Sequence, residues 1–210
     1  MSARVRLERR RPRRRTHAER TAETRQAIMR AVVESIAEVG FQRSTASEIA
    51  RRAGVTWGAV QHHFGGKDGI LIAVLEDSFN RFAERLSGIA ADGLSLERRA
   101  ALFVDRAWEH FGSAHFRSTS EILQHYAAPS SGDGWQEQML DAWDRVWSAI
   151  FGAEGLRGRR IALQHYTISA LTGLALLLRF EAPSAEVRER ELALLKETLV
   201  RELATKGARR

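Results

Sequence analysis

Three side chains between Trp57 and His62 have the chemistry needed to read base pairs in the major groove of DNA. Gln61 carries an amide that can bond to N6 and N7 of adenine, and His62 can donate to guanine or to a phosphate. Trp57 can contact a thymine methyl group or the sugar backbone, or it can pack against the first helix instead. His63, the next residue, is expected to be a buried core residue. These residue types predict base recognition by Trp57, Gln61 and His62.

Three further residues have the chemistry needed to bind phosphate. Thr45, Thr56 and Lys67 are each expected at the start of a helix. Backbone amides and the positive end of the helix dipole collect anions there, and hydroxyl or ammonium groups add to that attraction. We therefore expect these three residues to contact the DNA backbone.

Two short helices joined by a tight turn would position these side chains. Thr45 and Glu48 form the capping-box pattern, a Thr N-cap with a Glu three residues later. Gly54 suits the positive φ of a helix C-terminus, and Thr56 can cap a second helix that Gly65 ends. This is the layout of a DNA-binding helix-turn-helix, although an ordinary pair of antiparallel helices gives the same signals.

The charge of the chain is concentrated ahead of this motif. Residues 1–25 hold ten Arg and three Glu, a net charge of +7, so residues 26–210 carry 23 basic and 23 acidic groups and are neutral. A block of like charges favours disorder, and Arg favours phosphate, so residues 1–20 are predicted to form a disordered arm that contacts DNA. A solvated tail is the alternative. An anionic membrane is a weaker candidate, because no amphipathic apolar stripe accompanies the charges.

Composition predicts a cytoplasmic protein that makes no use of a membrane. Cysteine is absent, which excludes disulfides, thiolate metal sites and thiol catalysis. The N-terminus lacks the apolar segment of a signal peptide. The longest apolar run, 168–178, is too short to span a bilayer and is typical of a buried helix.

Helical periodicity predicts an all-α fold of about nine helices. Apolar residues recur at helical spacing over 67–89, 95–111, 116–126, 135–151, 159–180 and 185–203, after a first helix that Gly40 ends. No segment alternates long enough to predict a strand. The expected organisation is a three-helix helix-turn-helix domain over 21–68 and a larger helical bundle over 69–210, with an internal loop at 127–134.

Catalysis and metal binding are not predicted. The chain contains no phosphate-binding loop, dinucleotide-binding glycine pattern or nucleophile elbow. The seven histidines show no spacing typical of a metal site, and His62 and His63 point about 100° apart on a helix. We therefore expect neither a cofactor nor an enzymatic activity.

Residues 28–71 resemble the N-terminal domain of TetR-family transcriptional regulators. The resemblance rests on these positions: Gly40-Phe41, Thr45, Ile49-Ala50, Ala53-Gly54-Val55-Thr56, His63-Phe64, Lys67-Asp68 and Leu71. It implies an all-α homodimer with an N-terminal DNA-binding domain and a C-terminal domain that binds ligand and dimerises. Many members have Tyr where this chain has Gln61, so a Tyr–phosphate contact is not carried over.

The resemblance implies that the last two helices pair with their twins in a four-helix interface. Leu192, Leu195 and Leu199 form an apolar ridge on the last helix, continued by Leu203, while Ala170 and Gly173 are small enough to allow close approach. Packing of this ridge within one subunit is the alternative.

The resemblance also implies a cavity in each C-terminal domain. Its predicted lining consists of aromatic residues with a few polar groups, namely Trp108, Phe111, Gln124, His125, Trp143, Trp147, His165 and Tyr166. Such walls suit a mostly apolar ligand that bears a polar or aromatic group. A solid aromatic core is the alternative.

These expectations combine into a ligand-responsive regulator of transcription. We expect a homodimeric repressor that binds an inverted-repeat operator in double-stranded DNA and is released by a small, mostly apolar effector. The alternatives are a constitutive DNA-binding or architectural protein, and an activator without a small-molecule effector.

Overall fold

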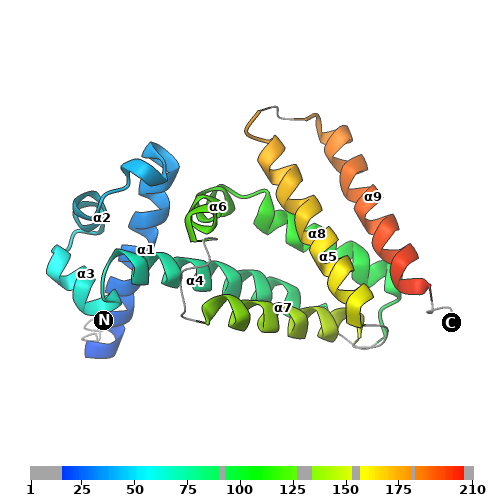
Figure 1. Cartoon of the computed structure of the whole chain (residues 1–210), viewed down its shortest axis with the longest axis horizontal. Coiled ribbons are helices and arrows are strands. Elements are labelled where there is room, and N and C mark those ends of the chain that lie inside the picture. Colours follow the sequence, from blue (N-terminus) through cyan, green and yellow to red (C-terminus); the bar gives the residue numbers. More distant parts are fainter. Residues whose placement is uncertain (1–15, 90–92, 127–133, 153–156, 181–182, 206–210) are drawn as a thin grey trace, which may run out of the picture.

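A computed structural model describes residues 16–89, 93–126, 134–152, 157–180 and 183–205 (Figure 1). These ranges contain α-helices, one short 3-10 helix and no strand, which confirms the predicted all-α fold. The elements are α1 (His17–Val39), η1 (Phe41–Arg43), α2 (Ala46–Ala53), α3 (Trp57–Phe64), α4 (Lys67–Ser87), α5 (Leu96–Phe111), α6 (Ala114–Tyr126), α7 (Trp135–Phe151), α8 (Arg157–Leu177) and α9 (Ala185–Ala204). Residues 1–15 of the predicted arm and 127–133 of the predicted loop lie outside the described residues.

Helix α1 begins inside the segment that the sequence assigned to the arm. Thr16 Oγ1 accepts a hydrogen bond from the Glu19 amide at 3.2 Å, and Glu19 Oε2 accepts one from the Thr16 amide at 2.7 Å. This reciprocal capping box satisfies two free amides of the first turn and starts the helix at His17.

The turn between α2 and α3 follows the sequence prediction closely. Gly54 ends α2 in the left-handed conformation, with φ at 67° and ψ at 31°. Thr56 Oγ1 accepts from the Ala59 amide at 3.2 Å and caps α3. Gly65 then ends α3 with φ at 76°, so α3 has only eight residues.

Helix α4 connects the two hydrophobic cores of the molecule (Figure 1). Its 21 residues span about 32 Å. Ile70 and Val74 belong to the N-terminal core together with residues of α1, α2 and α3, whereas Phe82 and Leu86 belong to the C-terminal core. The N-terminal core therefore continues beyond residue 68, and it also takes in Ile122 from α6.

The C-terminal core is rich in aromatic rings. Phe103 of α5 meets Trp147 of α7 edge to face at a centroid distance of 5.5 Å, and Phe82 stacks on Trp143 at 5.5 Å. Such pairs bury a large apolar area and add directional contacts between helices. Helices α8 and α9 run antiparallel along one side of this core (Figure 1). No described helix is long and apolar enough to cross a membrane.

Candidate nucleic-acid interface and effector cavity

Helix α3 presents two of the three predicted base-reading residues to solvent. Gln61 and His62 are exposed, while their neighbour Val60 is fully buried. Trp57 is half-buried and packs against the N-terminal core. This agrees with the alternative interpretation, in which Trp57 packs inside the domain instead of contacting DNA. His63 is half-buried rather than fully buried. The pKa of its imidazole is lowered mainly by burial and, to a smaller extent, by the charges of His62 and Arg25.

The three predicted phosphate-binding residues lie at helix starts, as expected. The Thr45 and Thr56 hydroxyl oxygens cap α2 and α3, and both residues are exposed. Each hydroxyl accepts a bond from its own helix and keeps its hydrogen free to donate to a phosphate oxygen. Lys67 is half-buried, and its Nζ lies 5.2 Å from the centroid of the Phe41 ring. Lys67 therefore contacts η1 from the start of α4.

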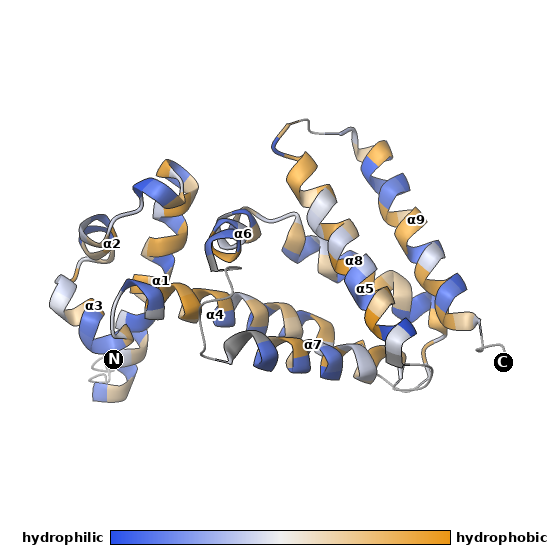
Figure 2. Ribbon diagram, in the orientation of Figure 1, coloured by the Kyte–Doolittle hydropathy of each residue, from blue (hydrophilic) through white to orange (hydrophobic). Residues whose placement is uncertain are grey.

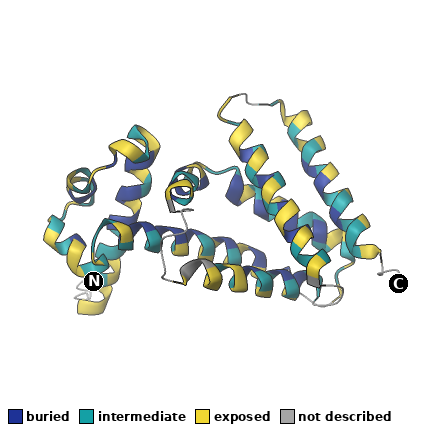
Figure 3. Cartoon of the chain, in the orientation of Figure 1, coloured by how far each residue is buried: buried dark blue, intermediate teal, exposed yellow. Residues whose placement is uncertain are grey.

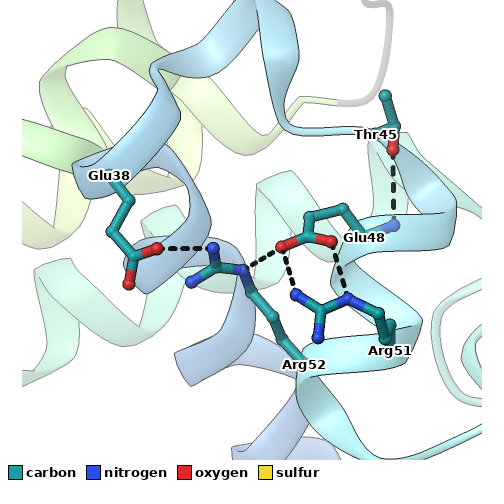
Figure 4. A network of polar contacts seen from close by, with 5 residues as sticks. All are labelled: Glu38, Thr45, Glu48, Arg51 and Arg52. Carbon is teal, nitrogen blue, oxygen red and sulfur yellow. Dashed lines mark hydrogen bonds and ion pairs between the residues drawn. The ribbon is translucent and has the colours of Figure 1, made fainter.

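The carboxylate of Glu48 does not complete the predicted capping box. The Glu48 amide donates to Thr45 Oγ1 at 3.3 Å, but the Glu48 carboxylate binds Arg51 at 2.8 Å and Arg52 at 2.5 Å (Figure 4). Hydrogen bonds from Arg51 and then Arg52 lower the pKa of Glu48 to about 2. Two guanidinium groups compete for the side chain more strongly than one backbone amide does.

This network ties α2 to α1. Arg52 bonds to Glu48 on its own helix and, at 2.5 Å, to Glu38 on α1 (Figure 4). The sequence offered a signal for the first contact, because Arg51 and Arg52 follow Glu48 by three and four residues. The contact with Glu38 depends on the packing of two helices and carries no such signal.

Arg25 holds the recognition helix from the other side. Its guanidinium donates to the backbone carbonyl of His63 and lies 4.2 Å from the centroid of the Phe64 ring. Sequence reasoning counted Arg25 among the charges ahead of the motif. The structure instead uses it to anchor the C-terminal end of α3 to α1.

A cavity of about 190 Å³ lies beside α4 in the C-terminal half of the chain. Residues of α4, α5, α6, α7 and α8 line it, among them Phe82, Phe111, Phe116 and Trp143. None of the described lining residues is acidic or is an Arg or Lys. This cavity has the concave, mostly apolar character of a small-molecule site.

Only two of the eight predicted ligand-binding residues are among the described residues that line this cavity, Phe111 and Trp143. Trp147 is fully buried in the C-terminal core, as the solid-core alternative expected for it. The Trp108 ring lies under the Arg188 guanidinium at 4.4 Å. His165 and Tyr166 are exposed on α8. The prediction grouped side chains by aromatic character, whereas the direction each one takes from its helix decides whether it reaches the cavity.

The other two predicted residues, Gln124 and His125, are exposed near the end of α6. His125 lies at a contact between α6 and η1 that we call the α6–η1 junction, formed by Phe41, Gln42, Glu121 and His125. The His125 ring stacks on Phe41 at a centroid distance of 3.8 Å, and Gln42 Nε2 donates to His125 Nε2 at 2.6 Å. His125 therefore joins α6 to η1, the segment just ahead of the predicted helix-turn-helix, and is not among the described residues that line the cavity.

Glu121 extends this junction to the end of α8. Its Oε2 accepts from the Phe41 amide at 3.0 Å, and its Oε1 pairs with Arg179 at 2.8 Å. One carboxylate thus links the segment just ahead of the helix-turn-helix to the residues that follow α8.

Comparison with known proteins identifies the family. Residues 28–74 match the family described as bacterial regulatory proteins, tetR family. Over 140 residues the chain is 37% identical to the uncharacterized HTH-type transcriptional regulator TtgW of Pseudomonas putida, covering 65% of this chain and 98% of TtgW. The chain belongs to the TetR family. These relatives are transcriptional regulators, which confirms the expectation that the chain is not an enzyme.

A second relative and one solved structure also resemble this TetR-family chain. It is 35% identical over 89 residues to BetI 2 of Chromohalobacter salexigens, which covers 42% of this chain and only 39% of that relative. The structure of the regulator FadR from Bacillus subtilis in complex with stearoyl-CoA resembles it with a TM-score of 0.60 at 19% identity, over 87% of this chain and 99% of FadR. That likeness shows a shared fold.

The leucines predicted for the dimer interface of this TetR-family chain are core residues of one subunit. Leu192, Leu195 and Leu199 are buried in the C-terminal core, as the alternative expected. Ala170 is half-buried against the same core, whereas Gly173 is exposed and a Cβ added there would meet nothing within 4 Å. An apolar ridge has the same sequence pattern whether it faces its own subunit or a partner.

A different apolar surface is exposed on α8 and α9. It consists of Tyr166, Leu176, Leu177, Phe180, Val187 and Leu194, which we call the α8–α9 face. Phe180 is 81% exposed and Leu194 50%. Figure 2 shows apolar turns at the C-terminal end of α8, and Figure 3 shows that the same end is exposed. Large apolar side chains exposed on two neighbouring helices make this face a candidate interaction site.

Proposed function

We propose that this chain is a ligand-responsive, homodimeric repressor of transcription. Two copies pair through the α8–α9 face and place two α3 helices in successive major grooves of an inverted-repeat operator. A small, mostly apolar effector enters the cavity beside α4 and releases the DNA. The protein works in the cytoplasm, where its DNA target lies.

The main support for this proposal is that α4 runs from the helices around α3 to the cavity. Ile70 and Val74 fix its first half to the helices that support α3, and Ser78 and Phe82 in its second half line the cavity. A ligand that favours one tilt of α4 changes the position of α3, and in a dimer it changes the distance between the two recognition helices. To shift the population from 99:1 to 1:99, the ligand must prefer the released state by about 5.5 kcal/mol.

The DNA-binding surface is proposed from the exposed side chains of α3 and the helix starts around it. Gln61 and His62 would contact base edges, with Trp57 at the edge of the groove. Thr45, Thr56 and Lys67 would contact phosphates. Bases carry sequence information and phosphates do not, so the two groups of residues have different effects on specificity.

Selection of bound fragments from random DNA tests the proposal. We expect an inverted repeat with half-sites about one helical turn apart, roughly 34–36 Å, or a multiple of it. Gln61→Ala should relax the preference at particular base pairs, whereas Lys67→Ala should weaken binding to every sequence alike. A direct repeat, or no consensus at all, would contradict a dimer with two equivalent recognition helices.

Release by a small molecule separates this function from constitutive or architectural DNA binding. The anisotropy of a labelled operator fragment is followed while a panel of small apolar compounds is added. A compound that binds the protein and lowers its DNA affinity supports the repressor, and linkage requires operator DNA to weaken the binding of that compound by the same factor. If compounds fill the cavity without changing DNA affinity, the constitutive alternative stands.

A further inference from the structure

The cavity beside α4 contains one imidazole and no fixed charge among its described lining residues. His110 of α5 lies 9% exposed at its wall, with its ring 4.9 Å from the Phe82 centroid and 5.4 Å from that of Phe116. The backbone carbonyl of His110 accepts from Ser113 Oγ at 2.7 Å. No described residue forms a hydrogen bond with the His110 ring nitrogens, and among the described residues Trp143 Nε1 in the same lining is also without a partner.

We propose that the effector is an uncharged aromatic compound with one hydroxyl group, and that His110 is the residue that selects it. This inference rests on the proposed function, because it assumes that the cavity beside α4 is the effector site. It assigns a chemical class to the effector and a specificity role to one side chain.

The size of the cavity suits a small compound. A cavity of about 150 Å³ lined by apolar side chains is known to bind benzene. The volume of about 190 Å³ therefore suits one substituted aromatic ring. Phe82, Phe111, Phe116 and Trp143 around it offer ring faces and edges for stacked and edge-to-face contacts.

The described lining carries no charged side chain and so favours an uncharged effector over an ionised one. A carboxylate or ammonium group that leaves water needs a paired charge or several hydrogen bonds in its new site. No acidic residue, Arg or Lys among the described residues lines the cavity. A charged compound of the same size would therefore lose far more solvation than it regains.

The protonation state of His110 fits a hydroxyl partner. The pKa of His110 is lowered to about 4, mainly by burial and to a smaller extent by the charges of His115 and Arg85. At neutral pH the ring is uncharged, with one nitrogen that donates and one that accepts. A hydroxyl group both donates and accepts, so it can bond to either nitrogen without a change of tautomer. Thr119, a buried hydroxyl in the same lining, is already committed to the carbonyl of Phe116 at 3.1 Å.

Four para-substituted toluenes test the proposal by titration calorimetry on the full chain. They are 4-methylphenol, p-xylene, 4-methylbenzoate and 4-methylbenzylamine, which differ only in the group opposite the methyl. We expect 4-methylphenol to bind about tenfold more tightly than p-xylene, the factor expected for one hydrogen bond, and the two ions not to bind. Binding of either ion as tight as that of 4-methylphenol, or failure of 4-methylphenol to bind, overturns the proposal.

Three variants test whether His110 is responsible for the preference for 4-methylphenol over p-xylene. His110→Phe should bind p-xylene as the wild type does and lose the tenfold preference for 4-methylphenol, and His110→Gln should restore part of it. Ser78→Ala, which removes another polar group from the same cavity, should keep the full preference. If Ser78→Ala loses the preference and His110→Phe keeps it, His110 is not the specificity residue.

A parallel DNA measurement separates this inference from the proposed function. If 4-methylphenol binds with a preference that His110→Phe removes, but leaves operator affinity unchanged, the ligand class stands and the repressor function fails. If 4-methylbenzoate releases the DNA and 4-methylphenol does not bind, the repressor function stands and the effector class is overturned.

Discussion

At the scale of single residues, Gly69 has a role that its sequence context does not reveal. It lies in the first turn of α4, where a Cβ would stand 1.8 Å from the carbonyl oxygen of Phe64 at the end of α3. Only glycine lets the two helices meet this closely. The junction between the recognition helix and α4 therefore depends on one missing methyl group.

Gly69→Ala should push α4 away from α3. We expect a loss of about 1–3 kcal/mol in the free energy of unfolding, typical of overpacking, together with weaker DNA binding. Urea denaturation and operator titration measure the two effects. Gly58→Ala is the control, because its Cβ would lie 3.8 Å from Thr56 Oγ1 and alanine favours a helix by about 1 kcal/mol. Equal stability of the Gly69→Ala variant and the wild type would contradict the clash expected for a Cβ at this position.

His110 should make the stability of the protein sensitive to mild acid. Its folded pKa is about 4, below the ordinary value of 6.5, so between these values the unfolded chain binds more protons. The stability is fully present above pH 6.5 and falls as the pH drops towards 4, by up to about 3 kcal/mol. Burial lowers the pKa of His115 in the same direction.

Urea denaturation of wild type and His110→Phe at several pH values checks this contribution. We expect the phenylalanine variant to lose less stability between pH 6.5 and 4. Glu48 acts in a separate window, because its pKa is lowered to about 2 and its contribution is lost only as the pH falls below the unfolded value of 4.5. Parallel curves for the two proteins above pH 4 would show that His110 is not responsible.

At the scale of elements, the two faces of α9 have opposite roles. Leu194 is 50% exposed and belongs to the α8–α9 face, whereas its neighbour Leu195 is 4% exposed and belongs to the core. Adjacent residues on a helix point about 100° apart, so these two leucines form a matched pair.

Leu194→Glu should give folded monomers with far weaker operator binding, because it places a charge in the proposed dimer interface. Leu195→Glu should instead unfold the subunit, since its charge would be buried without a partner. Sedimentation velocity and circular dichroism distinguish the two results. A Leu194→Glu variant that stays dimeric would move the interface away from the α8–α9 face.

At the scale of the whole molecule, α4 and the α6–η1 junction both connect the C-terminal helices to the DNA-binding motif. The carboxylate of Glu121 bonds to the Phe41 amide and to Arg179, so a shift of the chain after α8 reaches η1 through two short contacts. The α8–α9 face lies close to Arg179 in the chain. One ion pair, Arg179 with Glu121, therefore lies between the proposed dimer interface and the segment that leads into the DNA-binding motif.

Glu121→Ala should loosen this connection. We expect faster amide hydrogen exchange over 41–45 and operator binding weaker by roughly three- to thirtyfold, a change of about 0.7–2 kcal/mol. Glu109→Ala is the matched control, because Glu109 pairs with Arg85 at 3.1 Å on an exposed surface away from η1. If Glu121→Ala exchanges and binds DNA as the wild type does, the α6–η1 junction does not fix the motif.

Local signals in the sequence were enough for the features that depend on neighbours along the chain. The caps at Thr45 and Thr56 and the left-handed glycines at 54 and 65 follow from local hydrogen bonds and backbone sterics, and the structure confirms them. Helical periodicity likewise predicted an all-α chain, and the spaced residues of the helix-turn-helix predicted the family. These signals act within a few residues, so no knowledge of the packing was needed.

Packing of distant segments determined which face of each helix is covered and which side chains meet. Leu192 and Leu195 have the same apolar character in a core or in an interface, and only the packing of α9 against α5 placed them inside. His125 meets Phe41 from a different helix far along the chain, and Arg52 reaches Glu38 on α1. The cavity joins five helices whose relative rotation is set by the whole core. Contacts between distant segments depend on that rotation, which no local pattern encodes.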